Sequence, residues 1–82
     1  MKDNNLQKAE SHGQALAISA RQLSQMLGVS LRQVWRLNAA GKLPQPIRLG
    51  GSVRWNRDEI LRWFRAGCPS RQTWDATKEV RG

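Results

Sequence analysis

Three segments, each with a helix-start signal at one end and a glycine at the other, constrain the fold of this chain more than any other feature. Each begins at a short polar residue followed three positions later by Gln or Glu, a pairing that can cap a helix start: Ser19 with Gln22, Ser30 with Gln33, and Asn56 with Glu59. A glycine suited to the left-handed conformation that ends helices closes each segment, at Gly28, Gly41 and Gly67. The pattern predicts helices over about residues 20–27, 31–40 and 57–66.

The first two predicted helices are separated only by Gly28, Val29 and Ser30. This short connection is typical of a helix-turn-helix unit, in which the second helix can enter the major groove of DNA while the first braces it. Val29 is expected to plug the turn. Apolar residues at helical spacing predict the facing inner surfaces of the two helices: Leu23, Leu27, Val34 and Leu37.

Residues 42–55 predict a β-hairpin, because Pro44 and Pro46 exclude a helix and two alternating stretches follow. A two-residue turn at Gly50-Gly51 would place Ile47 beside Arg54 and mix apolar with charged side chains on one face. A three-residue loop would keep one face apolar and one cationic, through the pairs Leu49–Val53, Ile47–Trp55 and Arg48–Arg54. We therefore expect the three-residue register.

Charge points to the function class. The 82 residues include 14 Lys and Arg against 6 Asp and Glu, a net charge of +8, which favours a nucleic-acid partner. Arg32 and Arg36 lie opposite Val34 on the second helix, where their mutual repulsion is explained if a polyanion supplies the missing charge. The predicted major-groove residues are Ser30, Arg32, Gln33 and Arg36, and the predicted wing or backbone contacts are Lys42, Arg48, Gly51, Ser52 and Arg54.

Several of these residues also have a purely structural interpretation. Ser30 and Gln33 could serve only as helix caps, and Gly51 and Ser52 could serve only the turn. Arg32 and Arg36 could be ordinary solvated charges. Arg62 follows Asp58 by four residues, so that we interpret it as one half of an ion pair within a helix rather than as a DNA contact.

A run of linked motifs carries a family resemblance: Val29-Ser30, Val34-Trp35-Arg36-Leu37, Gly41-Lys42-Leu43-Pro44, Pro46-Ile47-Arg48-Leu49-Gly50-Gly51 and Val53-Arg54-Trp55. Over about residues 18–67 the chain resembles the AlpA/excisionase-type family, small winged helix-turn-helix proteins of phages and mobile elements related to the MerR DNA-binding unit. Leu31 stands where relatives often have Arg, and Trp35 where many have Tyr. Whether Trp35 packs on the wing or touches the DNA backbone stays open.

The resemblance implies a recognition helix over residues 30–38 and a wing over residues 47–55 that reaches the neighbouring minor groove. It implies an excisionase, or recombination directionality factor, that bends attachment-site DNA, binds beside neighbouring copies and directs an integrase toward excision. AlpA-like transcription regulation is a second interpretation. A third is a nucleoprotein adaptor, such as the DNA-binding part of a packaging terminase.

The expected fold class is mainly α with a small β-hairpin, a winged helix-turn-helix over residues 18–67. Residues 1–17 are expected to form a disordered arm, and residues 68–82 a short helix, at about 71–77, with a tail. Trp55 of the hairpin is expected in the core, together with Ile60, Trp63 and Phe64 of the third helix. Trp74 would indicate a protein partner if exposed, and a structural tail if packed.

The residue inventory predicts no enzyme, no cofactor and no metal site. Cys68 and His12 are each the single residue of their type, and the acidic residues are scattered. No apolar run approaches the roughly 18 residues of a membrane span, and no secretion signal follows Met1. We expect a cytoplasmic protein that is monomeric in free solution.

Overall fold

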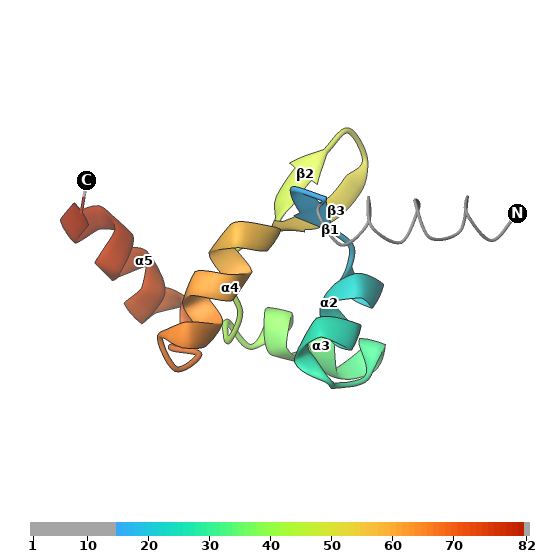
Figure 1. The fold of residues 1–82 in the computed structure, drawn as a ribbon, viewed down its shortest axis with the longest axis horizontal. Helices are drawn as coiled ribbons and strands as arrows, with labels where there is room; N and C mark the ends of the chain where they lie inside the picture. The colour runs from blue at the N-terminus through green and yellow to red at the C-terminus, as the bar shows by residue number, and fades with distance from the viewer. Residues whose placement is uncertain (1–14, 82) are drawn as a thin grey trace, which may run out of the picture.

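The computed structural model describes residues 15–81 (Figure 1). Within this range lie four helices and a three-stranded antiparallel sheet, as expected for a winged helix-turn-helix. In chain order the elements are β1 (Ala17–Ile18), α2 (Ala20–Leu27), α3 (Leu31–Ala39), β2 (Ile47–Leu49), β3 (Ser52–Asn56), α4 (Arg57–Arg65) and α5 (Arg71–Arg81). Of the expected arm, residues 1–14 lie outside the described range, and Ala17 already belongs to β1.

The predicted helix-turn-helix is present. Helix α2 ends at Gly28, which adopts the left-handed conformation with a φ of 73° and donates its N–H to the carbonyl of Ser24. Leu23 and Val34 are fully buried between the helices, and Val29 packs against the same core. The local signals at the turn therefore predicted the helix boundaries to within a residue.

Only one of the three predicted capping boxes is complete. At α2, Ser19 Oγ accepts from Gln22 N–H and Gln22 Oε1 accepts from Ser19 N–H. At α3 and α4 the cap residue accepts from the third helical residue, but the return bond from Gln33 or Glu59 is not made. The side chain of Glu59 turns instead toward α5.

The predicted hairpin is present, but its predicted register is wrong. The pairs are Ile47–Arg54, Arg48–Val53 and Leu49–Ser52, closed by a two-residue turn at Gly50-Gly51. Gly50 has a φ of 64° and Gly51 has no positive φ, the pattern of a type II′ hairpin turn. Arg48 therefore does not face Arg54 across the hairpin.

The register prediction failed because β2 has no buried face. All three of its residues are exposed, and β3 is the central strand of the order β1-β3-β2. The buried Trp55 pairs with Ile18 of β1 rather than with an apolar residue of β2. With no apolar face to preserve on β2, the geometry of the glycine turn sets the pairing.

The core gathers residues from every helix and from the centre of the sheet: Ile18, Ala20, Leu23, Val34, Leu43, Trp55, Ile60, Trp63 and Trp74. Phe64, expected in this core, is 57% exposed. The buried residues Ile60 and Trp63 define the face of α4 that packs on the core. The helical period places the side chain of Phe64 to one side of that face.

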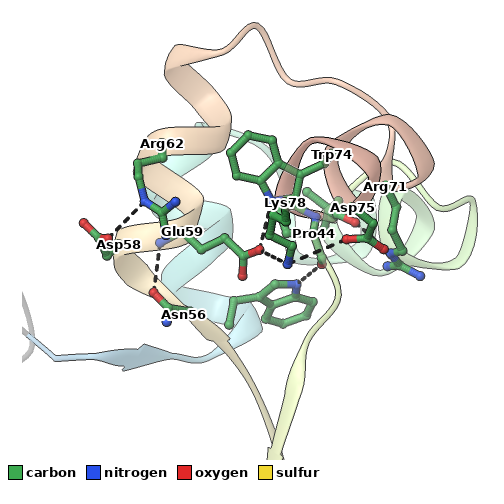
Figure 2. A network of polar contacts seen from close by, with 11 residues as sticks. Pro44, Asn56, Asp58, Glu59, Arg62, Arg71, Trp74, Asp75 and Lys78 are labelled. Atoms are coloured by element: carbon green, nitrogen blue, oxygen red, sulfur yellow. Dashed lines mark hydrogen bonds and ion pairs between the residues drawn. The ribbon is translucent and has the colours of Figure 1, made fainter. Parts of the chain in front are cut away.

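Helix α5 is longer than the expected 71–77 and is part of the folded unit. Trp74 is 6% exposed, and its Nε1 donates to Glu59 Oε2 of α4 at 2.8 Å. In Figure 2, dashed lines join the Glu59 carboxylate to Trp74 and to Lys78, and the Nζ of Lys78 donates to the same oxygen at 2.7 Å. The packed alternative for Trp74 is thus confirmed, and the segment after residue 68 is structural.

Arg71 fastens the start of α5 to the end of α3. Its Nε donates to the carbonyl of Leu43 at 2.9 Å, and its Nη2 donates to Asn38 Oδ1 at 2.8 Å. The Arg71 backbone N–H also donates to the carbonyl of Gly41. A cation at the C-terminal end of a helix interacts favourably with the helix dipole, so that Arg71 stabilises the junction.

Candidate nucleic-acid interface

The candidate interface begins with the outer face of α3. Val34 is fully buried, and residues two positions away in a helix lie about 200° around its axis. Arg32 and Arg36 consequently project on the side opposite the core, and both are exposed. Ser30 is exposed at the start of the same helix, where its Oγ accepts from the backbone N–H of Gln33 at 3.0 Å.

The amide of Gln33 is available for a ligand. Its capping interpretation required a bond from the side chain back to Ser30, and among residues 15–81 the Gln33 side chain makes no hydrogen bond. The residue is exposed on the flank of the helix that carries Arg32 and Arg36. An exposed amide at this position can form the paired donor and acceptor contact that reads a base edge.

A pair of tryptophans joins α3 to the wing. The ring centroids of Trp35 and Trp55 are 5.8 Å apart with planes tilted by 55°, a favourable aromatic geometry. Trp55 is fully buried and donates its Nε1 to the carbonyl of Pro44 at 3.0 Å. Trp35 therefore packs on the wing, which holds the hairpin at a defined position relative to α3.

The observed register separates the two wing arginines. Cross-strand partners in a sheet share a face and neighbours along a strand alternate, so that Arg48 lies on the face of Val53 and Trp55. Arg54 lies on the opposite face, and its Nη1 donates to the carbonyl of Val53 at 2.8 Å. The remaining predicted wing and backbone residues, Lys42, Gly51 and Ser52, are exposed.

The charges are divided between two parts of the molecule. From residue 15 to residue 57 the chain contains Arg and Lys but no Asp or Glu. Three acidic residues of α4 and α5 form ion pairs within these two helices: Asp58 with Arg62 at 3.1 Å, Glu59 with Lys78 at 2.7 Å, and Asp75 with Lys78 at 3.7 Å. The helix-turn-helix and wing therefore contain no acidic residue and carry only positive charge. The distribution of Asp and Glu along the sequence shows this, whereas the helix and hairpin motifs do not.

Two arginines outside the predicted interface, Arg62 and Arg71, have partners within the protein, whereas the predicted interface arginines have no carboxylate partner among the described side chains. Among the side chains of residues 15–78, no ion pair involves Arg32, Arg36, Arg48 or Arg54. Arg62 makes the expected bond to Asp58, and Arg71, which no sequence motif singled out, is held by main-chain and amide oxygens. Among these arginines, those of the helix-turn-helix and wing are left for an external anion.

The exposed side chains of α3 and of the hairpin combine positive charge with hydrogen-bonding groups. In the described part of the chain, no three side chains among His, Cys, Asp and Glu come together as a metal site. No helix between residues 15 and 81 has the length and apolar character to traverse a membrane. The arrangement suits a polyanion that also presents hydrogen-bonding edges.

The comparison with known families agrees with this geometry. Residues 18–68, more than half of the chain, match a family model described as a helix-turn-helix domain. The chain belongs to this helix-turn-helix family. The family includes AlpA/excisionase-type proteins, and helix-turn-helix membership indicates DNA binding. No curated protein and no solved structure matches the chain significantly.

Proposed function

We propose that this helix-turn-helix protein binds duplex DNA sequence-specifically and acts as an excisionase, a recombination directionality factor of a phage or mobile element. In this role α3 docks in the major groove through Arg32, Gln33 and Arg36, with Ser30 at the helix start. The loop that follows α3 and the hairpin contact the neighbouring backbone or minor groove, through Lys42, Arg48, Gly51, Ser52 and Arg54. The bound protein bends the attachment site and directs an integrase toward excision.

The observation that carries this proposal is the charge distribution around α3. Its outward face presents Arg32 and Arg36 without a carboxylate partner, within a segment that has no acidic residue from 15 to 57. Two like charges one helical turn apart repel mildly in the free protein, and a phosphate backbone removes that repulsion. The Trp35–Trp55 contact holds a second cationic element beside the helix, which suits a ligand with two adjacent grooves.

The biological role follows the family resemblance rather than the site geometry. An AlpA-like transcription regulator would use the same surface, and the motifs from Val29 to Trp55 suit both roles. A DNA-binding part of a packaging terminase has less support, because the burial of Trp74 removes the exposed aromatic residue that would have favoured a protein partner on the tail. We place the protein in the cytoplasm as a MerR-like, non-enzymatic factor, monomeric until neighbouring copies assemble on DNA.

Footprinting and recombination assays test the role. The protein is expected to protect the attachment region of the element that encodes it, and to raise excision by the integrase of that element. Arg36→Ala should weaken both effects, whereas Arg62→Ala, a matched change at an arginine paired with Asp58, should leave them intact. Protection of a promoter without any effect on excision would instead assign the protein to transcription control. Equal loss in both variants would remove α3 as the reading element.

A further inference from the structure

The outer face of the wing carries two uncovered aliphatic side chains. Ile47 is 42% exposed and Leu49 is 54% exposed. They pair with Arg54 and Ser52, so that all four lie on the face of the hairpin opposite Trp55. Leu49 is the last residue before the Gly50-Gly51 turn, at the end of a hairpin that projects from the helices (Figure 1).

These aliphatic side chains lie in cationic surroundings. Arg54, the cross-strand partner of Ile47, shares their face, Arg48 lies on the opposite face of the same strand, and no acidic residue occurs from 15 to 57. The turn itself is bare, since a Cβ built on Gly50 or Gly51 meets no atom within 4 Å. A tip of this shape can approach a phosphate backbone closely, with its arginines on the phosphates and its aliphatic groups pointing to the bases.

The size of the patch favours DNA over a protein partner. A stable protein interface buries roughly 800 Å² on each side, far more than two half-exposed aliphatic side chains on a three-residue strand provide. Minor-groove proteins, by contrast, insert single Leu or Ile side chains between base pairs and thereby kink the duplex. Charge complementarity selects the same partner, because a polyanion matches the unpaired arginines of the hairpin.

We propose that Leu49, supported by Ile47, is an apolar wedge that the wing inserts into the minor groove, where it unstacks one base step and bends the duplex. The inference rests on the proposed binding of duplex DNA and adds a specific mechanism for bending. The base of the hairpin is firmly held: Trp55, near the end of β3, is buried, hydrogen-bonded to Pro44 and packed on Trp35. A force on the tip of the hairpin is therefore transmitted to α3, the helix that docks in the major groove.

The test uses a duplex that the wild-type protein has selected from a randomised pool. 2-Aminopurine replaces adenine at each step in turn across the protected minor groove, since its fluorescence rises when the base is unstacked. The wild-type protein should raise the signal at one step, preferentially at a flexible pyrimidine–purine step. Leu49→Ala should abolish that rise and straighten the duplex, as measured by energy transfer between labelled ends.

The affinity of Leu49→Ala for the duplex should fall by less than about tenfold. The variant loses the apolar contact that leucine makes with the bases, but it also avoids the free-energy cost of unstacking a base step, so that the two effects partly cancel. Phe64→Ala, at a residue 57% exposed on α4, is the matched control and should keep the rise and the bend. Ile47→Ala should reduce the rise partly, and it provides a second reading if Leu49→Ala fails to fold by circular dichroism.

The outcomes separate the wedge from the function beneath it. A wild-type protein that binds no duplex would overturn both proposals. Binding without an unstacked step, or an undiminished rise in Leu49→Ala, would overturn the wedge alone. If Leu49→Ala kept the rise and the bend but no longer supported integrase-dependent excision, Leu49 would be a protein contact instead.

Discussion

Trp74 and Glu59 join the last helix of the protein to the helix that follows the wing. The indole N–H of Trp74 donates to Glu59 Oε2 at 2.8 Å across 15 residues of sequence, and the indole ring is buried in the common core. The same carboxylate oxygen accepts from Lys78 at 2.7 Å (Figure 2). Since a buried indole N–H needs a partner, Glu59 stabilises the docked position of α5.

Removing the carboxylate should therefore destabilise the protein. Glu59→Ala leaves the Trp74 N–H without an acceptor in the core, and we expect a loss of about 1–3 kcal/mol in the free energy of unfolding. Glu59→Gln retains an acceptor oxygen and should cost less than Glu59→Ala. Urea unfolding followed by tryptophan fluorescence measures both. Equal stability of the alanine variant and the wild type would show that α5 is not held by this bond.

Stability should also depend on pH through Lys78. The hydrogen bond to Glu59 raises the pKa of Lys78 above its ordinary value of 10.5. The lysine therefore binds its proton more tightly in the folded state, and this contribution is complete below pH 10.5 and is lost as the pH rises through the raised pKa. Lys78→Met should flatten the alkaline fall in urea midpoint, and Lys78→Arg, which stays charged, should flatten it while preserving the stability at neutral pH. An unchanged alkaline slope in both variants would exclude this coupling.

Arg36 and Arg54 should differ in what they contribute to DNA binding. If Arg36 reads a base edge, Arg36→Ala should weaken specific binding by about 1–3 kcal/mol and relax the preference at one position. Arg54→Ala should weaken specific and random duplexes alike and reduce the slope of log affinity against log salt by about one. Titrations over a range of salt concentrations, on selected and random duplexes, measure both quantities. Identical losses on both DNAs for both variants would leave α3 without a reading role.

The glycine turn offers a direct test of the hairpin register. Gly50 has a φ of 64°, a conformation that an L side chain adopts at a cost, so that Gly50→Ala should lower stability by about 1–2 kcal/mol. Gly51 has no positive φ and no atom within 4 Å of an added Cβ, and Gly51→Ala should change stability by less than about 0.5 kcal/mol. Thermal unfolding of the two variants gives the comparison. Greater sensitivity at Gly51 would contradict the two-residue turn.

The helix boundaries could be predicted because the signals that set them are local. Ser19 and Gln22 satisfy each other's backbone groups within one helical turn, and Gly28 closes α2 through its own φ. The ion pair of Asp58 with Arg62 is equally local, since four residues span one turn. The outward position of Arg32 and Arg36 could also be predicted, because the apolar residues around Val34 recur at helical spacing and identify the buried face of the helix.

The tertiary structure decided the features that depend on distant segments. Glu59 bonds to Trp74 and Lys78 rather than completing its capping box, because folding brings a buried indole within reach of the carboxylate. The strand that pairs with Trp55 comes from Ile18, so that β2 became an exposed edge and its register followed the glycine turn. Neighbouring residues determine the local hydrogen bonds and backbone conformations that start and end a helix. The packing of the whole chain determines which strand is central and which faces are buried.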